Sequence, residues 1–582
     1  MKKLVKEKYL ILLLFLFISI ALIGIIDWHY GYVFATGDFH YHLDRIETLA
    51  SSIKHLNFWP KVDGHFIGGY GYASSLFYPD LFLYPAALLR VIGATPVFSY
   101  LFTLVMINFV TLWIGFIAGK RMSLSPNKAL LFTLIYTFNA YRLQTLFSRQ
   151  DLGELMGAMF FPLVLSELIN LKRGNVKQWY VLAFAMIGIS CSHTISLFMI
   201  IVFASLFVLL NIRIFWNKKR ILAIVKAAGL TIGISAAVYL PILEQMQGQK
   251  YALTTDPLIK VTNEILPMKN LILNSLTNQV FHANTVNLGA IIFLGLAVYA
   301  IYNLIHRRNL DLTLIALVFF IACTNLFPWG IFSHSIFAMI QFPWRFFSVI
   351  SLIVAYLLAN DDLNLFRNQY VIYGFVALLS IVTAGLSQQT LAESPDKLES
   401  YQQFNKVDSF FIGAGHEYLP SEVSYPEVLD HKDRLIKYNK SNVKISNSTI
   451  NRQYIAFNFN THGKTSKVQL PLIYYKGYQS EVYGNTGSST TPRISSNGLT
   501  TIELVGSGTV KVQYENTFIQ KFSLMVSASV LLLTLLMLLK KRRDNTSLSD
   551  SVPLLIEPVN NDYVFVYKII NGYTEPMKKN LP

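Results

Sequence analysis

Just after its first hydrophobic span the chain carries the stretch Thr36-Gly37-Asp38-Phe39-His40-Tyr41-His42-Leu43-Asp44-Arg45. Most of these side chains can titrate or form hydrogen bonds, and they crowd the mouth of an expected membrane helix. Buried charge is unfavourable unless it is paired, so polar residues gathered at a membrane boundary usually face water, a cavity or a ligand. We therefore predict that the rest of the protein is a membrane scaffold that holds this cluster at the outer interface.

A structural interpretation of the same stretch stays open. Asp38 could cap the amphipathic helix expected at about 41–56, because a carboxylate accepts hydrogen bonds from the free N–H groups at a helix N-terminus. His40 and His42 would then be ordinary interfacial residues.

The composition is that of a polytopic membrane protein. Of the 582 residues, 53% are hydrophobic and 14% are charged, and the mean hydropathy is +0.42. The net charge is +16, but Lys and Arg occur in short runs between apolar segments, which membrane topology explains better than a nucleic-acid partner. The two cysteines, Cys191 and Cys323, lie in or beside hydrophobic segments, so the sequence predicts no disulfide framework.

Hydropathy predicts about twelve transmembrane helices. The apolar start of the chain lacks a convincing cleavage site and is expected to be a retained anchor. The expected helices lie at about 9–26, 97–118, 129–143, 155–171, a tight pair on either side of 190–194, 221–243, 288–305, 310–326, 337–358, 371–386 and 522–539.

The basic clusters fix the expected orientation. With these twelve crossings nearly all of them fall on one side, which places both termini in the cytoplasm of a bacterial plasma membrane. This requires that the apolar stretch 76–94 lies in the outer interface. It contains Pro79, Asp80, Pro85 and Arg90, which disfavour a crossing helix.

The expected domains follow from this topology. Residues 1–386 form a multi-span domain with an external loop at 28–96, and residues 387–518 form an extracytoplasmic β-rich domain. Alternating patterns at 454–459, 468–475, 500–505 and 509–514 predict strands of a small β-sandwich. A last transmembrane helix, 519–543, precedes a cytoplasmic tail, 544–582. The Gly- and aromatic-rich loop 64–72 could bend around a ligand or be a plain surface loop.

Several polar groups share the outer membrane level in this topology. No phosphate-binding loop, dinucleotide fingerprint, zinc-type Cys/His spacing or nucleophile elbow occurs, which makes ATP hydrolysis and soluble-cofactor redox chemistry unexpected. Polar groups at the interface beside an apolar groove suit an amphipathic substrate. The candidates are Asp38, His40, His42, Asp44, Arg45, Arg149, Asp151, Glu154, His193, Gln341, Trp344 and Arg345.

These side chains can be given chemical roles. A carboxylate can accept the proton of a substrate hydroxyl, and Arg or His can stabilise a phosphate leaving group. Asp151 and Glu154 could hold a divalent cation, Mg²⁺ or Mn²⁺, or position a sugar. A structural role stays open for each, since Arg149 and its acidic neighbours could form interfacial ion pairs and Arg345 could extend to the lipid headgroups.

The layout resembles the GT-C superfamily of membrane glycosyltransferases. More closely, it resembles the bacterial YfhO-like membrane proteins and the neighbouring family labelled "6-pyruvoyl-tetrahydropterin synthase related", although the zinc-binding His pattern of the soluble synthase is not evident. The segments that carry the resemblance are Gly37-Asp38-Phe39-His40-Tyr41-His42, Ser148-Arg149-Gln150-Asp151-Leu152-Gly153-Glu154, Gly415-His416-Glu417-Tyr418-Leu419-Pro420 and Pro471-Leu472-Ile473-Tyr474-Tyr475-Lys476-Gly477-Tyr478.

The resemblance implies that Asp38 is similar to the catalytic Asp of the first GT-C loop. It implies that Asp151 and Glu154 resemble the acidic pair that helps to hold the cation in metal-dependent members. The spacing Asp-Leu-Gly-Glu departs from a pair separated by one residue, which puts metal dependence in doubt.

The resulting hypothesis is a transferase that moves a sugar from a polyprenyl-phosphate donor to a cell-envelope polymer or glycolipid outside the membrane. Asp38 would be the base, and His40, His42, Asp44, Arg45, Arg149, His193 and Arg345 would contact substrate. Two alternatives are a transporter or flippase for a lipid-linked glycan and a non-catalytic envelope assembly factor. The first predicts charged or broken helices at mid-membrane and inverted repeats, and few such charges and no obvious repeat are seen. Nothing in the sequence indicates the oligomeric state.

Overall fold

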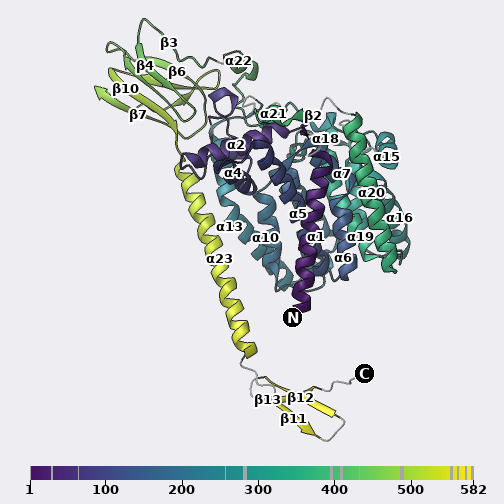
Figure 1. The fold of residues 1–582 in the computed structure, drawn as a ribbon. Coiled ribbons are helices and arrows are strands. Elements are labelled where there is room, and N and C mark those ends of the chain that lie inside the picture. Colours follow the sequence, from purple (N-terminus) through teal and green to yellow (C-terminus); the bar gives the residue numbers. More distant parts are fainter. Residues whose placement is uncertain are drawn as a thin grey trace.

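The computed structural model shows a body of roughly parallel helices with a β-rich region at one end (Figure 1). The start of α1 (Lys2–Asp27) and the carboxyl end of α23 (Phe518–Asp550) lie at the opposite end. The structure describes residues 2–27, 31–62, 64–255, 257–278, 285–393, 398–406, 411–431, 433–485, 490–550, 555–559, 563–570 and 573–577.

Six helical segments in these ranges are long and apolar enough to cross a membrane, judged by length and composition. They are Pro96–Arg121 (α5), Leu152–Lys172 (α8, Leu152–Ala158, with α9, Phe161–Lys172), Lys218–Gly248 (α13), Gly289–His306 (α16), Pro343–Asn360 (the 3₁₀ turn Pro343–Phe346 with α19, Phe347–Asn360) and Phe518–Lys540 of α23. Shorter apolar helices are Tyr9–Gly24, Leu81–Val91, Trp179–Ser190 (α10), Thr194–Leu210 (α11), Leu310–Ala322 (α17) and Gln369–Leu379. The prediction of a largely helical, multi-pass membrane protein with a β-rich region near the C-terminus is confirmed.

The centre and the edge of the helical body differ in burial. Almost every residue of α19 is buried, so this helix is central. In contrast, α23 is mostly exposed and packs against α13, where the Ser527 hydroxyl accepts a hydrogen bond from the Ala237 N–H at 2.9 Å. A long apolar helix with an exposed surface is what a lipid-facing position requires.

The helix predicted at 129–143 is interrupted. Helix α6 (Pro126–Thr137) ends early, because Asn139 caps a separate short helix, α7 (Ala140–Gln144), by accepting a hydrogen bond from the Arg142 N–H at 3.0 Å. A π-helical turn, Thr145–Arg149, follows α7. Polar residues such as Asn139, Arg142 and Gln144 occur at this junction, and Asn139 supplies the cap that starts the new helix.

The first external segment folds over the end of the helices. Its elements are β1 (Tyr32–Phe34), α2 (Phe39–Lys54), a 3₁₀ turn at Ile67–Gly69, α3 (Ser74–Phe77), a 3₁₀ turn at Leu81–Leu83 and α4 (Tyr84–Val91). The amphipathic helix expected at about 41–56 is α2, whose apolar side chains such as Leu43 and Ile46 are buried.

The remaining short elements connect the long helices. They are α12 (Ile212–Phe215), α14 (Ala252–Thr255), Val261–Asn263, α15 (Met268–Leu276), α18 (Trp329–Phe332), Ile336–Ile340, α21 (Tyr401–Phe404) and α22 (Tyr425–Asp430). Helix α20 (Gln369–Glu393) extends past 387, so the boundary predicted at 386/387 lies inside a helix. After α20, β2 (Leu398–Ser400) returns to pair with β1, which brings the chain back to the first external segment.

Two antiparallel four-stranded sheets make up the β-rich region. Their orders are β4 (Lys444–Ile450), β5 (Tyr454–Asn460), β10 (Ser507–Tyr514), β7 (Tyr478–Asn485), and β3 (Lys437–Tyr438), β6 (Ser466–Ile473), β9 (Leu499–Leu504), β8 (Arg493–Ile494). Alternate side chains such as Phe457, Val468 and Val510 come from both sheets and form one hydrophobic cluster. The Ile473 N–H donates to the Tyr70 carbonyl at 2.9 Å, which ties this region to the first external segment. Beyond α23 a small sheet contains β11 (Leu555–Val559), β12 (Tyr563–Ile570) and β13 (Tyr573–Met577).

Candidate active site

Asp38 lies at the N-terminus of α2 but does not cap this helix with its side chain. The Asp38 carboxylate forms no hydrogen bond or ion pair with any residue that the structure describes. Its backbone is held firmly, because the Asp38 N–H donates to the Arg149 carbonyl at 2.8 Å. The structural interpretation in which this carboxylate serves as a helix cap is therefore wrong.

Gly37 makes this backbone contact geometrically feasible. Its φ is +58°, and a Cβ at this position would lie 2.0 Å from the Arg149 carbonyl oxygen. Only glycine combines the left-handed conformation with so close an approach. The Thr36 hydroxyl adds a hydrogen bond to the Ser148 carbonyl at 2.8 Å, so the first external segment is clamped directly onto the turn that presents Arg149.

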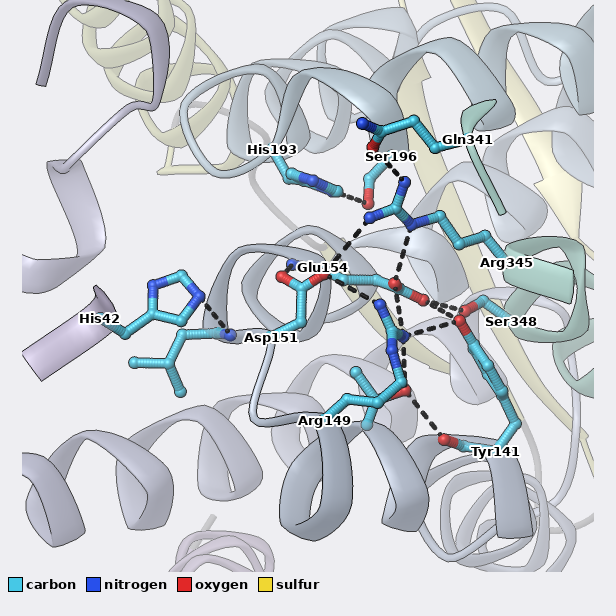
Figure 2. Close-up of polar contacts among 12 residues, drawn as sticks. His42, Tyr141, Arg149, Asp151, Glu154, His193, Ser196, Gln341, Arg345 and Ser348 are labelled. Carbon is cyan, nitrogen blue, oxygen red and sulfur yellow. Dashed lines mark hydrogen bonds and ion pairs between the residues drawn. The ribbon is translucent and has the colours of Figure 1, made fainter. Parts of the chain in front are cut away.

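Arg149, Asp151 and Glu154 form one network (Figure 2). The π-helical turn ends at Arg149, and Gln150 adopts a left-handed φ of 49°, after which Asp151 starts α8. The Arg149 guanidinium contacts Glu154 Oε2 at 3.0 Å and Asp151 Oδ2 at 3.2 Å. The Asp151 carboxylate also caps α8, accepting from the Glu154 N–H at 2.9 Å. The interruption of the helix at this turn thus directs the Asp151 and Glu154 carboxylates toward the Arg149 guanidinium.

Arg345 brings a second guanidinium to the same carboxylates (Figure 2). Its Nε lies 3.4 Å from Glu154 Oε2 and its Nη2 lies 3.7 Å from Asp151 Oδ2. The Tyr141 hydroxyl donates to Glu154 Oε1 at 2.5 Å. Two carboxylates and two guanidiniums therefore compensate each other in a buried cluster, as buried charges require.

Glu417 extends the network toward Asp38. Its Oε1 accepts a hydrogen bond from Gln341 Nε2 at 3.2 Å, and Gln341 Oε1 accepts one from Arg345 Nη1, also at 3.2 Å. A Cβ on Gly415 would lie 1.9 Å from the same Glu417 oxygen, so glycine at 415 makes room for the carboxylate. The segment after α20 thus contributes an acidic side chain to the site.

Burial raises the pKa of Asp38 from its usual 3.8 to about 7. The neighbouring carboxylates of Asp151 and Glu417 add to the rise, and the guanidiniums of Arg149 and Arg345 oppose it. For Asp151 burial also disfavours the charged form, but the permanent positive charges of Arg149 and Arg345 oppose it, and the pKa lies well below its usual range. Two acidic groups side by side are thereby separated into one that stays ionised and one that titrates near neutrality.

The two histidines beside this cluster are neutral. Burial lowers the pKa of His193 to about 4, and its Nδ1 lies 2.8 Å from the Ser196 hydroxyl (Figure 2). Burial and the Arg45 guanidinium lower the pKa of His42 to about 3. The Leu152 N–H donates to His42 Nε2 at 3.2 Å, so this side chain links α2 to the start of α8.

The other predicted residues of the first stretch lie further from Asp151. His40 Nε2 is 3.1 Å from Glu399 in β2, and the imidazole is half-exposed. Arg45 is fully buried and pairs with Asp80 at 2.6 Å, donating also to the Pro79 carbonyl at 2.8 Å. Asp44 is fully buried as well. The two Nη groups of Arg45 are thus engaged within the protein.

Asp151 and Glu154 do not fit a divalent cation in this arrangement. Each of their four carboxylate oxygens already accepts a hydrogen bond from an arginine, a tyrosine, a serine or the backbone, and two guanidinium charges adjoin them. No group of three or more His, Cys, Asp or Glu side chains suited to a metal ion occurs within the ranges given above. A cation would face two fixed positive charges, which disfavours its binding.

The sequence analysis did not identify Tyr78, Tyr141, Ser348 and Glu417 as site residues. The Tyr78 hydroxyl donates to Asp151 Oδ1 at 3.2 Å, and its ring stacks on that of His193 with centroids 5.4 Å apart. Glu417 lies in one of the segments that carry the family resemblance, which was the available signal. The two tyrosines had none, because tyrosine is common throughout the chain.

Comparison with protein families identifies the chain. The model of the family described as bacterial membrane protein YfhO matches residues 66–414, which is more than half of the sequence. The chain belongs to the YfhO family. The resemblance noted from the sequence is therefore confirmed, and the matched region of this YfhO protein includes Arg149, Asp151, Glu154 and Arg345 but neither Asp38 nor Glu417.

Two solved structures resemble this YfhO protein in parts of their length. AftD, an arabinofuranosyltransferase from Mycobacteria, has a TM-score of 0.42 and 13% identity, with 67% of this chain and 27% of AftD covered. The oligosaccharyltransferase of Archaeoglobus fulgidus in the apo form has a TM-score of 0.40 and 13% identity, with 69% of this chain and 56% of that chain covered. The chain spans less than two thirds of either protein. No curated protein matches it.

Proposed function

We propose that this YfhO protein is a membrane glycosyltransferase. It transfers a sugar from a polyprenyl-phosphate donor to a cell-envelope polymer or glycolipid at the outer face of the membrane. The observation that carries the proposal is the Asp38 carboxylate, which has no hydrogen-bond partner among the described residues, titrates near pH 7 and adjoins two guanidiniums. A general base is most effective when its pKa lies near the working pH.

The proposed reaction uses the groups at this site as follows. Asp38 accepts the proton of an acceptor hydroxyl while that oxygen bonds to the anomeric carbon of the donor sugar. The bond from the anomeric carbon to the phosphate oxygen breaks, and polyprenyl phosphate leaves with the electron pair. Stabilisation of the charge on the leaving phosphate is the second requirement of such a step.

Arg149 and Arg345 are proposed to meet this requirement. Arg149 Nε and Arg345 Nη2 donate no hydrogen bond within the described part of the chain, so N–H groups remain for an anion. Asp151 and Glu154 hold the two guanidiniums in place. Planar guanidinium groups recognise phosphate well, and fixing them in advance makes them more effective catalytically.

The charge distribution supports an outer location for the site. Basic residues gather at the end of the helical body opposite Asp38, and the side richer in Lys and Arg is the cytoplasmic side of a membrane protein. We propose about twelve crossings, with both termini in the cytoplasm and the two four-stranded sheets outside as a β-sandwich. The basic residues include Lys120, Arg121, Lys172, Arg173, Lys218, Arg220, Arg308 and Lys540.

The proposal can be tested by envelope glycan analysis. A deletion strain is complemented with the wild-type gene, with Asp38→Asn or with Glu481→Gln as a control. Glu481 lies exposed on β7 and contacts only the Tyr483 hydroxyl among the described residues. We expect one sugar decoration to vanish on deletion, to return with wild type and Glu481→Gln, and to stay at background with Asp38→Asn. General-base catalysis typically contributes 10²–10⁴-fold.

Two results would overturn the proposal. Full restoration of the decoration by Asp38→Asn, at matched protein levels, would exclude Asp38 as the base. An unchanged envelope glycan profile after deletion would exclude the transferase itself and favour a transporter or an assembly factor.

A further inference from the structure

A cavity lies between α22, the sheet β3-β6-β9-β8 and Tyr70 of the first external segment. The empty space within it, part of which is open to solvent, is about 450 Å³. None of the residues assigned to the candidate active site lines it. It is therefore a separate feature of the outer end of the molecule.

Two amide side chains in its wall, those of Gln469 and Asn497, are held by hydrogen bonds. Gln469 Nε2 donates to Asn497 Oδ1 at 2.6 Å and to the Ser495 hydroxyl at 3.0 Å. The Ser495 hydroxyl in turn accepts from the Leu499 N–H at 3.0 Å, which fixes the turn that carries Asn497. These bonds orient both amides.

The same bonds leave one free polar atom on each amide. Gln469 Oε1 and Asn497 Nδ2 have no hydrogen-bond partner among the residues described. One is an acceptor and the other is a donor, and both belong to residues that line the cavity. A sugar hydroxyl both donates and accepts, so an adjacent acceptor and donor match two neighbouring hydroxyls.

The rest of the lining is mixed. Glu427 and Lys437 contribute charged groups at the rim, and neither forms an ion pair within the described chain. Leu435, which is exposed, and the mostly buried Val428 contribute apolar surface. Sugar rings present C–H faces and hydroxyl edges, so a cavity with apolar walls and a few oriented polar groups is suited to them.

We infer that this cavity binds one hexose unit of a glycan chain, and that this chain is the acceptor. The Tyr70 hydroxyl donates to the His431 carbonyl at 2.8 Å, so one wall is joined to the external segment that also carries Asp38. A bound unit would hold a polymer at a fixed position relative to the active site. Binding does not depend on the proposed function, whereas the assignment as acceptor rests on it.

The test uses the full-length protein in lipid nanodiscs. Saturation-transfer NMR with the methyl glycosides of glucose, galactose and N-acetylglucosamine detects weak sugar binding directly. The double variant Gln469→Ala/Asn497→Ala removes both oriented amides, and Asn458→Ala is the matched control. Asn458 is an amide on β5 of the other sheet, where it accepts from the Thr509 hydroxyl at 2.7 Å.

We expect wild type and Asn458→Ala to bind at least one glycoside and the double variant to bind at least about tenfold more weakly, the change that loss of one good hydrogen bond produces. If the double variant unfolds, Glu427→Gln/Lys437→Met alters the exposed rim instead and is expected to weaken binding. If the wild-type protein gives no saturation-transfer signal with any of the three glycosides, it does not bind them and the inference is overturned. Unchanged binding in the variants would place the sugar elsewhere and overturn it equally.

The two proposals fail in different ways. Asp38→Asn should keep glycoside binding while it abolishes sugar transfer. The double variant should raise the KM for the acceptor and leave kcat within about twofold, because it touches no group near the reacting atoms. Binding without any transfer activity would refute the transferase proposal alone.

Discussion

The charged groups at the two ends of the helical body are arranged differently. At the end that carries the basic clusters, three cations each contact one carboxylate on another helix or loop: Arg121 and Glu167 at 2.6 Å, Lys172 and Asp311 at 2.7 Å, Lys128 and Asp361 at 3.5 Å. At the outer end, two guanidiniums share two carboxylates, with Asp38 and Glu417 nearby.

The cations at the two ends also differ in exposure and in how many of their N–H groups are bonded. The inner cations are partly exposed, at 21–34% of their side-chain surface, and their contacts join helix ends. The outer guanidiniums of Arg149 and Arg345 are 15% and 6% exposed and keep free N–H groups. An ion pair that only joins two helices does not require an additional carboxylate without a hydrogen-bond or ion-pair partner, such as Asp38. This difference is what the proposed function requires of the outer cluster.

The largest expected effect comes from removing Glu154. Glu154→Leu deprives both guanidiniums of a shared partner, and breaking a buried ion pair from one side typically destabilises by 3–5 kcal/mol. The free energy of unfolding in mixed micelles should fall by about that amount. Lys172→Met at the inner end should lower it by only about 0–1 kcal/mol, because its ammonium group is more exposed. Equal losses at both ends would contradict the distinction.

The composition of this cluster was only partly predictable. The sequence brought Asp38, Arg149, Asp151, Glu154 and Arg345 to one membrane level, because topology fixes the depth of every loop. It could not show that the carboxylates pair with the arginines, since pairing depends on side-chain directions set by the π-helical turn after α7. The residues before that turn include Arg142 and Gln144, but their polarity does not specify a π-helical turn.

The β-rich region shows where sequence reasoning succeeds. The strands predicted at 454–459, 468–475, 500–505 and 509–514 correspond to β5, β6, β9 and β10, because alternation of apolar and polar residues directly reflects one buried face. Glu417, in contrast, reaches the site through a chain segment that returns from α20 and pairs β2 with β1. Such a long-range contact leaves no periodic pattern.

The pH dependence of activity and of stability tests whether the pKa of Asp38 is raised, which distinguishes the outer cluster from the inner ion pairs. Asp38 must be ionised to act as a base, so kcat/KM should fall about tenfold per pH unit below an apparent pKa of about 7 and level off above it. The same shift has a consequence for stability. A pKa raised from 3.8 to about 7 favours the native state at low pH, and this advantage is lost as the pH rises through 7.

Asp38→Asn should therefore raise the unfolding temperature at pH 8 while it removes activity. A helix cap would behave in the opposite way, since its loss lowers stability by about 1 kcal/mol. A lower unfolding temperature for Asp38→Asn at pH 8 would assign Asp38 to the scaffold and erase the contrast with the inner end.

A smaller effect is expected from moving Asp38 without removing it. Gly37→Ala introduces a Cβ 2.0 Å from the Arg149 carbonyl oxygen, in addition to strain at a φ of +58°. Gly93→Ala is the matched control, because Gly93 has a φ of +99° and no atom within 4 Å of the added Cβ. Both variants carry the backbone strain of about 1–3 kcal/mol, but only Gly37→Ala should also lower kcat. Equal kcat values in the two variants would show that the position of Asp38 is not critical.

The smallest effect is expected from removing divalent cations. Asp151 and Glu154 are held by Arg149 and Arg345, and these guanidiniums occupy the positions beside the carboxylates that a cation would need. Sugar transfer by the purified protein should therefore change by less than about twofold when EDTA replaces Mg²⁺ or Mn²⁺, because arginine N–H groups can stabilise phosphate charge without a metal. A complete loss with EDTA, restored by Mn²⁺, would mean that the network opens when substrate binds and that the arginines release the carboxylates to a cation. In that case the outer cluster would differ from the inner ion pairs by being able to exchange partners, and Arg345→Met should then tighten the apparent affinity for Mn²⁺.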